Sequence, residues 1–240
     1  MIIIPARVDS SRFANKVLVD VLGLPMVIRT AKQVQDLDDV VIATDSQEVM
    51  DIASKYGIRA IMTSTLHQSG TDRVNECANI LNLKNSDVVI NVQADEPFIE
   101  KEVVAKVIDR VKYNIYQKED FTMVSCYKKI SSELSDDPNH VKVVLDTFQN
   151  AIYFSRSKVP YHRDHHNVTS YNGHLGIYGF SKQSLNKFCD LDVAPLESIE
   201  KLEQLRAIYN GYKIAMVEVE SKSFGIDTKE DLDNALRIFA

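Results

Sequence analysis

Apolar residues along the first half of the chain alternate between short continuous runs and stripes with helical spacing. Residues 1–4 form a β-branched apolar run, and further runs follow at 40–43 and 87–92. Continuous runs of this length are typical of strands that are buried on both faces of a parallel sheet. Between the runs, apolar residues recur every three or four positions, as they do on the buried side of an α-helix. The alternation predicts an α/β fold with a doubly wound, mainly parallel sheet.

Polar residues and glycines mark where some of these helices begin and end. Ser46 can cap one helix, and Gly57 can end it. A further strand is expected at 58–62. The segments with helical spacing in this half are residues 24–34, 46–56, 71–81 and 103–111. Strands and helices therefore follow one another in the order that parallel connections require.

The pattern changes after about residue 120, where strand-like segments come close together. The strand-like segments of the second half are residues 121–130, 141–146, 151–154 and 213–219. The second and third of these are separated by a short polar turn, which predicts a β-hairpin. Helical spacing returns at 195–209, and Thr228 can cap a final helix. We interpret residues 1–240 as a single α/β domain in which residues 120–185 form an inserted, mostly antiparallel subdomain that covers the mouth of the sheet.

Composition narrows the classes of protein to which the chain can belong. It has 240 residues, 45% hydrophobic and 26% charged, with a formal net charge of -6. A nucleic-acid-binding surface needs a cationic excess, so the acidic balance argues against one. No apolar stretch approaches the ~20 residues of a membrane span, so no membrane association is expected. The three cysteines form no CxxC pair. They indicate reduced thiols in a cytoplasmic protein.

Three cations follow the first predicted strand within ten residues. They are Arg7, Arg12 and Lys16. Ligands of open α/β sheets bind beyond the carboxyl ends of the strands, where this loop is expected. Arginine forks and a lysine point charge together suit phosphate oxygens. The loop therefore predicts a polyanion site, and the alternative is a basic surface loop paired to nearby carboxylates.

Two aspartates follow extended segments in the same way. Asp95 comes after the most buried strand, and Asp227 directly precedes the start of the last helix. Mg²⁺ usually takes only one or two protein carboxylates and completes its shell with water and phosphate oxygens. Opposite a cationic loop, such a pair indicates metal-assisted phosphoryl or nucleotidyl transfer. For Asp95 the alternative is a turn or capping role ahead of Pro97.

Residues 67–73 offer a glycine, two hydroxyls and a helix N-terminus. Such a segment suits a nucleotide base and ribose, or an anion. Ser69-Gly70-Thr71 before a helix is also a common capping sequence. The segment alone therefore leaves both interpretations open.

These motifs belong to an ordered series that spans the whole chain. The series consists of Ile4–Arg7, Ser11-Arg12, Lys16, Ala43–Asp45, His67–Arg73, Asn91–Pro97, Val141–Asp146, Tyr153–Arg156, His174–Gly179, Pro195–Glu197, Leu202–Arg206 and Asp227–Leu232. Any one motif is common among sugar nucleotidyltransferases, but the full ordered set is specific. The set closely resembles the CMP-Kdo synthetases, which are 3-deoxy-manno-octulosonate cytidylyltransferases.

The resemblance implies that CTP and Kdo, a sugar acid, give CMP-Kdo and pyrophosphate with Mg²⁺ as cofactor. The catalytic residues that it implies are Arg7, Arg12, Lys16, Asp95 and Asp227, the two aspartates being the metal ligands. Nucleotide binding is implied for Pro5, Ala6, Arg7, Arg12, Lys16, Ala43, Asp45, Gln68, Ser69, Gly70 and Arg73. Sugar-acid binding is implied for Gln93, Arg156, Arg163, His174, Tyr178, Glu203 and Gln204. A homodimer through the inserted half and a role in lipopolysaccharide synthesis are implied as well.

Several alternatives stand beside this interpretation. His174 has the alternative of a buried histidine bonded to backbone, and Glu203 and Gln204 that of a solvated helix face. His162, His165 and His166 can suggest a metal cluster, but their loop favours a mobile polar segment. The acceptor can instead be a related acid, such as 8-amino-Kdo or a sialic-type nonulosonate. A silent nucleotide-binding regulator with the same fold is the alternative from another class.

Two positions depart from the family pattern. The family usually has Pro-Gly before the lysine of the first loop, and here Ala14-Asn15 stands there. Asparagine tolerates positive φ better than most residues, so we expect the turn to survive. The family has glycine between the glutamine and the aspartate of the fourth motif, where this chain has Ala94. Its methyl group could crowd the metal or the sugar.

Overall fold

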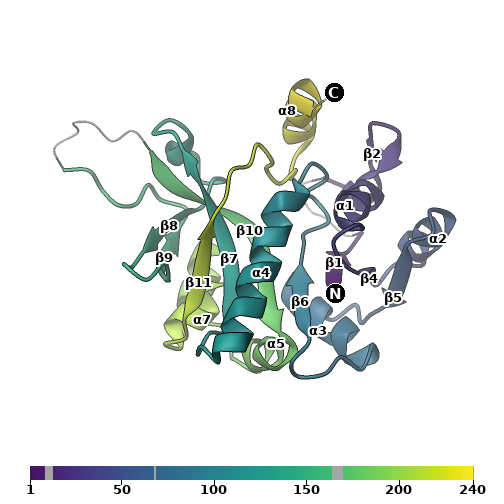
Figure 1. Cartoon of the computed structure of the whole chain (residues 1–240). Coiled ribbons are helices and arrows are strands. Elements are labelled where there is room, and N and C mark those ends of the chain that lie inside the picture. The colour runs from purple at the N-terminus through teal and green to yellow at the C-terminus, as the bar shows by residue number, and fades with distance from the viewer. Residues whose placement is uncertain (9–12, 68, 164–169, 240) are drawn as a thin grey trace.

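A nine-stranded sheet forms the centre of the computed structural model, which describes residues 1–8, 13–67, 69–163 and 170–239 (Figure 1). In pairing order, the strands of its main path are β11 (Ile214–Glu218), β7 (Met123–Ile130), β10 (Tyr171–Ser181), β6 (Val88–Asn91), β1 (Ile2–Ala6), β4 (Val40–Thr44) and β5 (Arg59–Met62). Neighbours from β6 to β5 are parallel, as are β11 and β7. β10 is antiparallel to both its neighbours. The predicted mainly parallel α/β fold is confirmed.

The predicted hairpin extends this sheet from β10. Its strands are β8 (Lys142–Leu145) and β9 (Ala151–Ser155), which pair antiparallel, and β8 also pairs with β10. Residues 120–185 thus supply β7 to β10. β7 and β10 lie within the main sheet, where β10 separates the parallel pair β11–β7 from the parallel strands β6 to β5, and β8 and β9 project from it.

Helices cover both faces of the sheet because side chains alternate along each central strand. In β1, Ile2 and Ile4 enter one hydrophobic cluster, and Ile3 enters the other. The helices of the first face are α1 (Met26–Val34), α2 (Gln47–Lys55) and α4 (Lys101–Gln117). Those of the second are α3 (Gly70–Ile80), α5 (Lys182–Cys189) and α7 (Leu205–Tyr209). All three isoleucines are fully buried, and each contributes about 1.5–3 kcal/mol on burial.

A third hydrophobic cluster fastens the C-terminal helix above the sheet. The smaller elements of the fold are η1 (Lys16–Leu18), β2 (Asp20–Val21), β3 (Leu24–Pro25), η2 (Leu134–Asp136), α6 (Pro195–Glu200) and α8 (Lys229–Phe239). Phe239 of α8 stacks on Phe98, with ring centroids 4.4 Å apart. Ile226, just before α8, is fully buried in the same cluster. This packing anchors the segment that carries Asp227.

The observed caps agree with those predicted from the sequence, but one predicted helix does not form as a single element. The Ser46 side chain accepts a hydrogen bond from the Val49 amide, and Gly57 has φ +70°. The single helix predicted over 195–209 is wrong. The chain breaks at Lys201, which adopts φ 54°, and α6 and α7 are separate. The predictions also lacked strand β10 and helix α5.

No helix in the described part of the chain combines the length and the apolarity that crossing a bilayer requires.

Candidate active site

The site lies beyond the carboxyl ends of β1, β4 and β6, where the parallel topology brings three loops together. Pro5 and Ala6 end β1, and Ala43 lies near the end of β4; all three are buried. Gly70 packs against the end of β1. A Cβ at Gly70 would lie 3.2 Å from Pro5 Cγ and 3.4 Å from the Oε1 of Gln93. Glycine therefore permits the close approach of the predicted nucleotide and sugar loops.

Lys16 joins the two predicted metal ligands. Its Nζ lies 2.6 Å from an oxygen of Asp95 and 2.8 Å from an oxygen of Asp227. Burial disfavours its charged form, but the charges and hydrogen bonds of Asp95 and Asp227 outweigh this and raise the pKa of Lys16. Asn15, which precedes η1, has φ 53°. The departure from Pro-Gly therefore keeps the positive-φ turn that delivers Lys16 to the aspartates.

Backbone and capping bonds hold Asp227 beside Asp95. The Ile226 amide donates to the Asp95 carbonyl at 2.9 Å. The Asp231 carboxylate accepts from the amides of Asp227 and Thr228 at 3.0 and 2.8 Å, and the Thr228 hydroxyl caps α8. Two residues far apart in the sequence thus meet through one main-chain bond and one helix cap.

This pair of carboxylates fits a divalent cation. Both side chains point at one position, which the Lys16 ammonium occupies at hydrogen-bond distance from each. Among the described residues, no group of three or more His, Cys, Asp or Glu side chains gathers for a metal. Two carboxylates suit Mg²⁺, which keeps water and phosphate oxygens, better than zinc, which needs three or four protein ligands.

A cavity of about 260 Å³ opens beside the two aspartates. The predicted site residues that line it are Gln93, Asp95, His174, Tyr178, Gln204 and Asp227. They come from the β6 loop, from β10, from the turn before α7 and from the segment before α8. The structure thus brings four predicted sugar-binding residues and both predicted metal ligands around one space.

A hydrogen-bond chain orients the histidine of this cavity. The Ser125 hydroxyl donates to the Ile177 carbonyl at 2.8 Å and lies 2.8 Å from His174 Nε2. His174 Nε2 therefore carries the proton, and Nδ1 faces the Gln204 amide at 3.5 Å. The Tyr178 hydroxyl donates to Gln204 Oε1 at 3.1 Å. Burial lowers the pKa of His174 to about 3, so the ring is uncharged at neutral pH.

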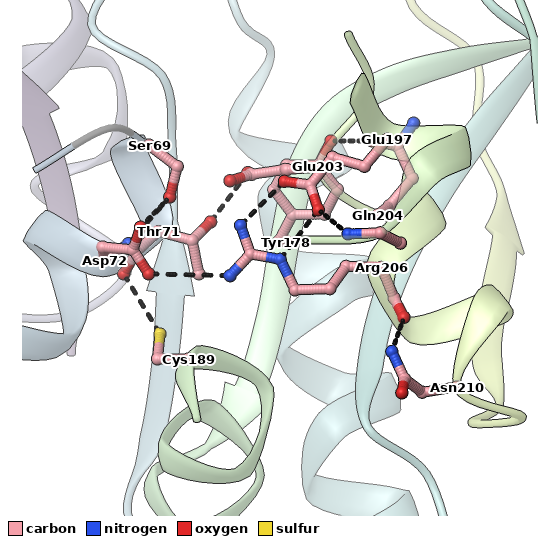
Figure 2. A network of polar contacts seen from close by, with 11 residues as sticks. Ser69, Thr71, Asp72, Tyr178, Cys189, Glu197, Glu203, Gln204, Arg206 and Asn210 are labelled. Carbon is pink, nitrogen blue, oxygen red and sulfur yellow. Dashed lines mark hydrogen bonds and ion pairs between the residues drawn. The ribbon is translucent and has the colours of Figure 1, made fainter. Parts of the chain in front are cut away.

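A second polar network links the α3 N-terminus to the turn before α7 (Figure 2). The Thr71 hydroxyl donates to Glu203 Oε1 at 2.7 Å. Arg206 binds Glu197 through Nε and Nη2, at 2.9 and 2.7 Å, and its Nη1 lies 3.8 Å from Asp72. The Glu197–Arg206 pair spans the break between α6 and α7 and fixes the turn that presents Glu203.

The surroundings of the Glu203 carboxyl group favour its neutral, protonated form. Burial raises its pKa, and the Thr71 hydrogen bond only partly opposes the rise. Its Oε2 atom is buried and has no hydrogen-bond partner in the described structure. A buried oxygen without a partner is costly unless a ligand supplies a donor. Gln204 is only 1% exposed, so the two residues do not form a solvated helix face.

On the nucleotide side, several predicted residues bind one another. Ser69 caps α3 by accepting from the Asp72 amide at 3.1 Å, which is the capping role that its sequence left open. Arg73 donates to Asp45 and to Thr63, both at 2.6 Å, and is 3% exposed. These bonds hold the ends of β4 and β5 against α3. Asp45 and Arg73 therefore support the predicted nucleotide-binding segments by binding each other.

The two arginines predicted to bind the sugar acid, Arg156 and Arg163, are not among the described residues that line the cavity. Arg156 donates to the carbonyls of Glu200, Pro138 and Lys201 at 2.7, 3.0 and 3.5 Å, so its guanidinium binds backbone. Arg163 is exposed on the loop that follows β9. The sequence-based expectation that either one faces the sugar carboxylate finds no support in these positions.

Two further arginines, Arg7 and Arg12, were predicted to bind the nucleotide. Arg7 is exposed directly after β1. Arg12 and Gln68 lie outside the described residues, as do His165 and His166.

The cavity also has lining residues that sequence reasoning missed. They are Glu96, Lys128, Asp137, Asn139, His140, Ser223 and Asp231, with several apolar neighbours. Glu96 is adjacent to Asp95 in the motif, so its position was a signal that could have been used. Burial raises the pKa of Glu96 to about 7, and the Ser223 hydroxyl donates to it at 2.6 Å. Asp231 lies within the Asp227–Leu232 motif and could have been found in the same way. The remaining residues come from separate segments and belong to none of the motifs.

Ala94 causes no crowding of the cavity. It is 4% exposed and packs within the hydrophobic cluster of the first sheet face. The Thr30 hydroxyl donates to its carbonyl at 2.9 Å, which pins the loop that carries Asp95. Ala94 is not among the described residues that line the cavity.

A doubly wound sheet with paired aspartates, a bridging lysine and a polar cavity beyond its strand ends is suited to the class of nucleotidyltransferases. Comparison with known proteins gives the family. A family model described as cytidylyltransferase matches residues 1–214. The chain belongs to the cytidylyltransferase family.

Similar proteins span almost the entire chain. A 3-deoxy-manno-octulosonate cytidylyltransferase of Nitratiruptor sp. is 57% identical over 233 residues, which are 97% of this chain and 96% of that protein. The protein of the same name from Wolinella succinogenes is 51% identical and covers 100% of this chain and 99% of its own. A solved CMP:2-keto-3-deoxy-manno-octonic acid synthetase complexed with CTP has a TM-score of 0.87 and 34% identity, covering 99% of this chain and 96% of that one.

Proposed function

We propose that this protein transfers the cytidylyl group of CTP to 3-deoxy-manno-octulosonate, giving CMP-Kdo and pyrophosphate for lipopolysaccharide synthesis. The similar proteins of that name support the choice of nucleotide and acceptor. The observation that carries the proposal is the convergence of Asp95 and Asp227 on the Lys16 ammonium beside a polar cavity.

The reaction has to bring two anions together. The anomeric hydroxyl of the sugar attacks the α-phosphorus, a new O–P bond forms, and the bond to the pyrophosphate oxygen breaks. Lys16 is charged at neutral pH because its pKa is raised, so its ammonium can hold triphosphate oxygens and stabilise the leaving charge. Arg7, directly after β1, is exposed and can contribute a further positive charge; Arg12 lies outside the described residues.

Asp95 and Asp227 are the residues that would hold Mg²⁺. When bound, the ion supplies positive charge at the α-phosphate and lowers the pKa of the attacking hydroxyl. In that state the aspartates no longer need the Lys16 ammonium as their counter-charge. Lys16 would then be available to the triphosphate.

The cavity supplies the mixture of groups that a polyhydroxy acid requires. His174 is neutral and Gln204 and Tyr178 are tied to each other, so donors and acceptors are fixed in place before the sugar binds. Glu203 is not among the described residues that line the cavity, but it directly precedes Gln204, and its unpartnered Oε2 would need a donor from a bound ligand or from a rearranged neighbour. Gln93 lies between this region and Gly70 of the nucleotide loop.

The assembly and compartment belong to the same proposal. The β8–β9 hairpin exposes large apolar side chains, with Phe148 77% and Ile152 53% exposed. Their position supports a homodimer through residues 120–185. The three cysteines are free thiols, which supports a cytoplasmic location.

An acceptor assay tests the proposal. The purified protein is supplied with CTP, Mg²⁺ and one sugar acid at a time, and pyrophosphate release is followed. Kdo should give turnover, whereas 8-amino-Kdo and a sialic-type nonulosonate should give much less. Turnover with a nonulosonate and none with Kdo would overturn the acceptor. Binding of CTP without any product would instead indicate a nucleotide-binding regulator.

A further inference from the structure

The segment that carries Asp227 has no regular secondary structure of its own. Residues 219–228 join β11 to α8 without helix or strand, yet Asp227 must lie within a few ångströms of its place opposite Asp95 to share one cation. The Ile226–Asp95 main-chain bond and the cap of α8 hold the end of this segment, and side chains from neighbouring elements are needed to hold its start.

Two carboxylates from one loop hold the start of this segment. Glu96 Oε2 accepts from the Ser223 hydroxyl at 2.6 Å. Glu100 Oε2 accepts from the Ser221 hydroxyl at 2.6 Å, and its Oε1 accepts from the Lys222 amide at 2.7 Å. Hydrogen bonds to a carboxylate are roughly twice as strong as neutral ones.

A lysine from β7 completes the arrangement. The Lys128 ammonium donates to the carbonyls of Ser223 at 2.6 Å and of Ser221 at 3.3 Å. We call these three residues, Glu96, Glu100 and Lys128, the clasp. The loop that supplies Asp95 also supplies the two carboxylates of the clasp, so one loop carries the first metal ligand and holds the segment of the second.

We propose that Glu96, Glu100 and Lys128 are positioning residues, which hold residues 221–223 so that Asp227 faces Asp95 and the two together bind the divalent cation. The inference rests on the proposed function, because it takes the two aspartates as ligands of the metal in the metal–CTP complex. Glu100 gives the cleanest test, since it is not among the described residues that line the cavity.

Calorimetry with two forms of the nucleotide isolates this role. Binding of CTP premixed with Mn²⁺, and of CTP in EDTA, is measured for the wild type, Glu100→Gln and Ser221→Ala. We expect Glu100→Gln to weaken Mn²⁺–CTP binding about tenfold, and Ser221→Ala about threefold. Binding of metal-free CTP should change less than about twofold, because the nucleotide loop is untouched. Glu102→Gln, an exposed residue of the first turn of α4 with the same loss of charge, is the matched control.

Hydrogen exchange gives a readout that needs no metal. The Ile226 amide donates to the Asp95 carbonyl, so its exchange should quicken in Glu100→Gln and stay unchanged in Glu102→Gln. Ser221→Ala keeps the Lys222–Glu100 bond and tests the clasp even if Glu100→Gln folds poorly.

Three results would overturn the inference. They are equal Mn²⁺–CTP affinity in Glu100→Gln and wild type, an equal loss for metal-free CTP, and an equal loss in Glu102→Gln. The acceptor assay with wild-type protein is separate. If Kdo gives no product but Glu100→Gln still weakens Mn²⁺–CTP binding, the proposed function fails and the role of the clasp stands. If Kdo gives product but Glu100→Gln binds Mn²⁺–CTP as tightly as the wild type, only the role of the clasp fails.

Discussion

At the scale of single residues, the site depends on how the charges of Asp95, Asp227 and Lys16 are balanced. Two carboxylates that face one position repel each other unless a cation lies between them. In this structure Lys16 is that cation, with contacts of 2.6 and 2.8 Å. The same geometry suits Mg²⁺, and the proposed function requires that the metal replace Lys16 between the aspartates when the nucleotide binds.

Replacing Asp95 should remove turnover while leaving the fold intact. Asp95→Asn keeps the shape of the side chain but loses the charge that holds the ion. We expect kcat to fall at least about a hundredfold, which is about 2.7 kcal/mol in barrier height. Pyrophosphate release with CTP and Kdo measures the loss. Asp109→Asn, on the exposed side of α4, should keep wild-type turnover, and an active Asp95→Asn enzyme would contradict the assigned role.

The buried histidine makes stability depend on pH. The pKa of His174 is lowered to about 3, whereas an unfolded histidine titrates near 6.5. The unfolded chain therefore takes up the proton first, and the stabilisation present above about pH 6.5 is lost as pH falls toward 3. Between pH 7 and pH 5, wild-type protein should lose about 1–2 kcal/mol more of its free energy of unfolding than His174→Gln does. Urea denaturation at both pH values measures the difference, and equal losses would show that the pKa of His174 is not lowered by folding.

At the scale of elements, the break between α6 and α7 shapes the acceptor side of the site. A continuous helix over 195–209 would leave Glu203 and Gln204 on a helix face. Instead Lys201 adopts a left-handed conformation, and the turn that follows directs Glu203 and Gln204 inward. Arg206 and Glu197 pair across this break (Figure 2), so the break is held by a buried ion pair.

That ion pair should be strongly non-additive on mutation. Arg206→Met leaves the Glu197 carboxylate buried with only the Ala194 amide as a partner and no counter-charge, and should cost about 3–5 kcal/mol of unfolding free energy. The double variant Arg206→Met/Glu197→Met removes both charges and should recover a large part of that cost. Chemical denaturation of the wild type, both single variants and the double variant measures the coupling. Additive losses would mean that the two residues do not act as a pair.

The elements also show what local sequence can predict. Buried apolar runs, serine caps and the glycine after α2 determine most strands and helices of the first half, and these were predicted. The break at Lys201 was not, because a lysine in a left-handed conformation carries no local signal and is imposed by tertiary contacts. The backbone contacts of Arg156 were not predicted for a similar reason, because the carbonyls that it binds belong to segments that meet only in the fold. Its role in sugar binding stays a prediction.

At the scale of the whole molecule, topology decides which distant residues meet. Both aspartates could be predicted, because each ends an extended segment in an α/β chain whose strand ends share one edge of the sheet. The position of the Lys16 ammonium between the two aspartates could not be predicted, and neither could the clasp on residues 221–223. They depend on how the segment before α8 crosses β7 and the loop after β6, which no periodicity records.

The most direct test of the account is a crystal structure with CTP and Mn²⁺, in which anomalous scattering locates the metal. We expect one Mn²⁺ with a carboxylate oxygen of both Asp95 and Asp227 at a distance on the order of 2 Å, and the Lys16 ammonium moved onto the triphosphate. A metal bound by the triphosphate alone, with Lys16 still bridging the two aspartates, would contradict the account.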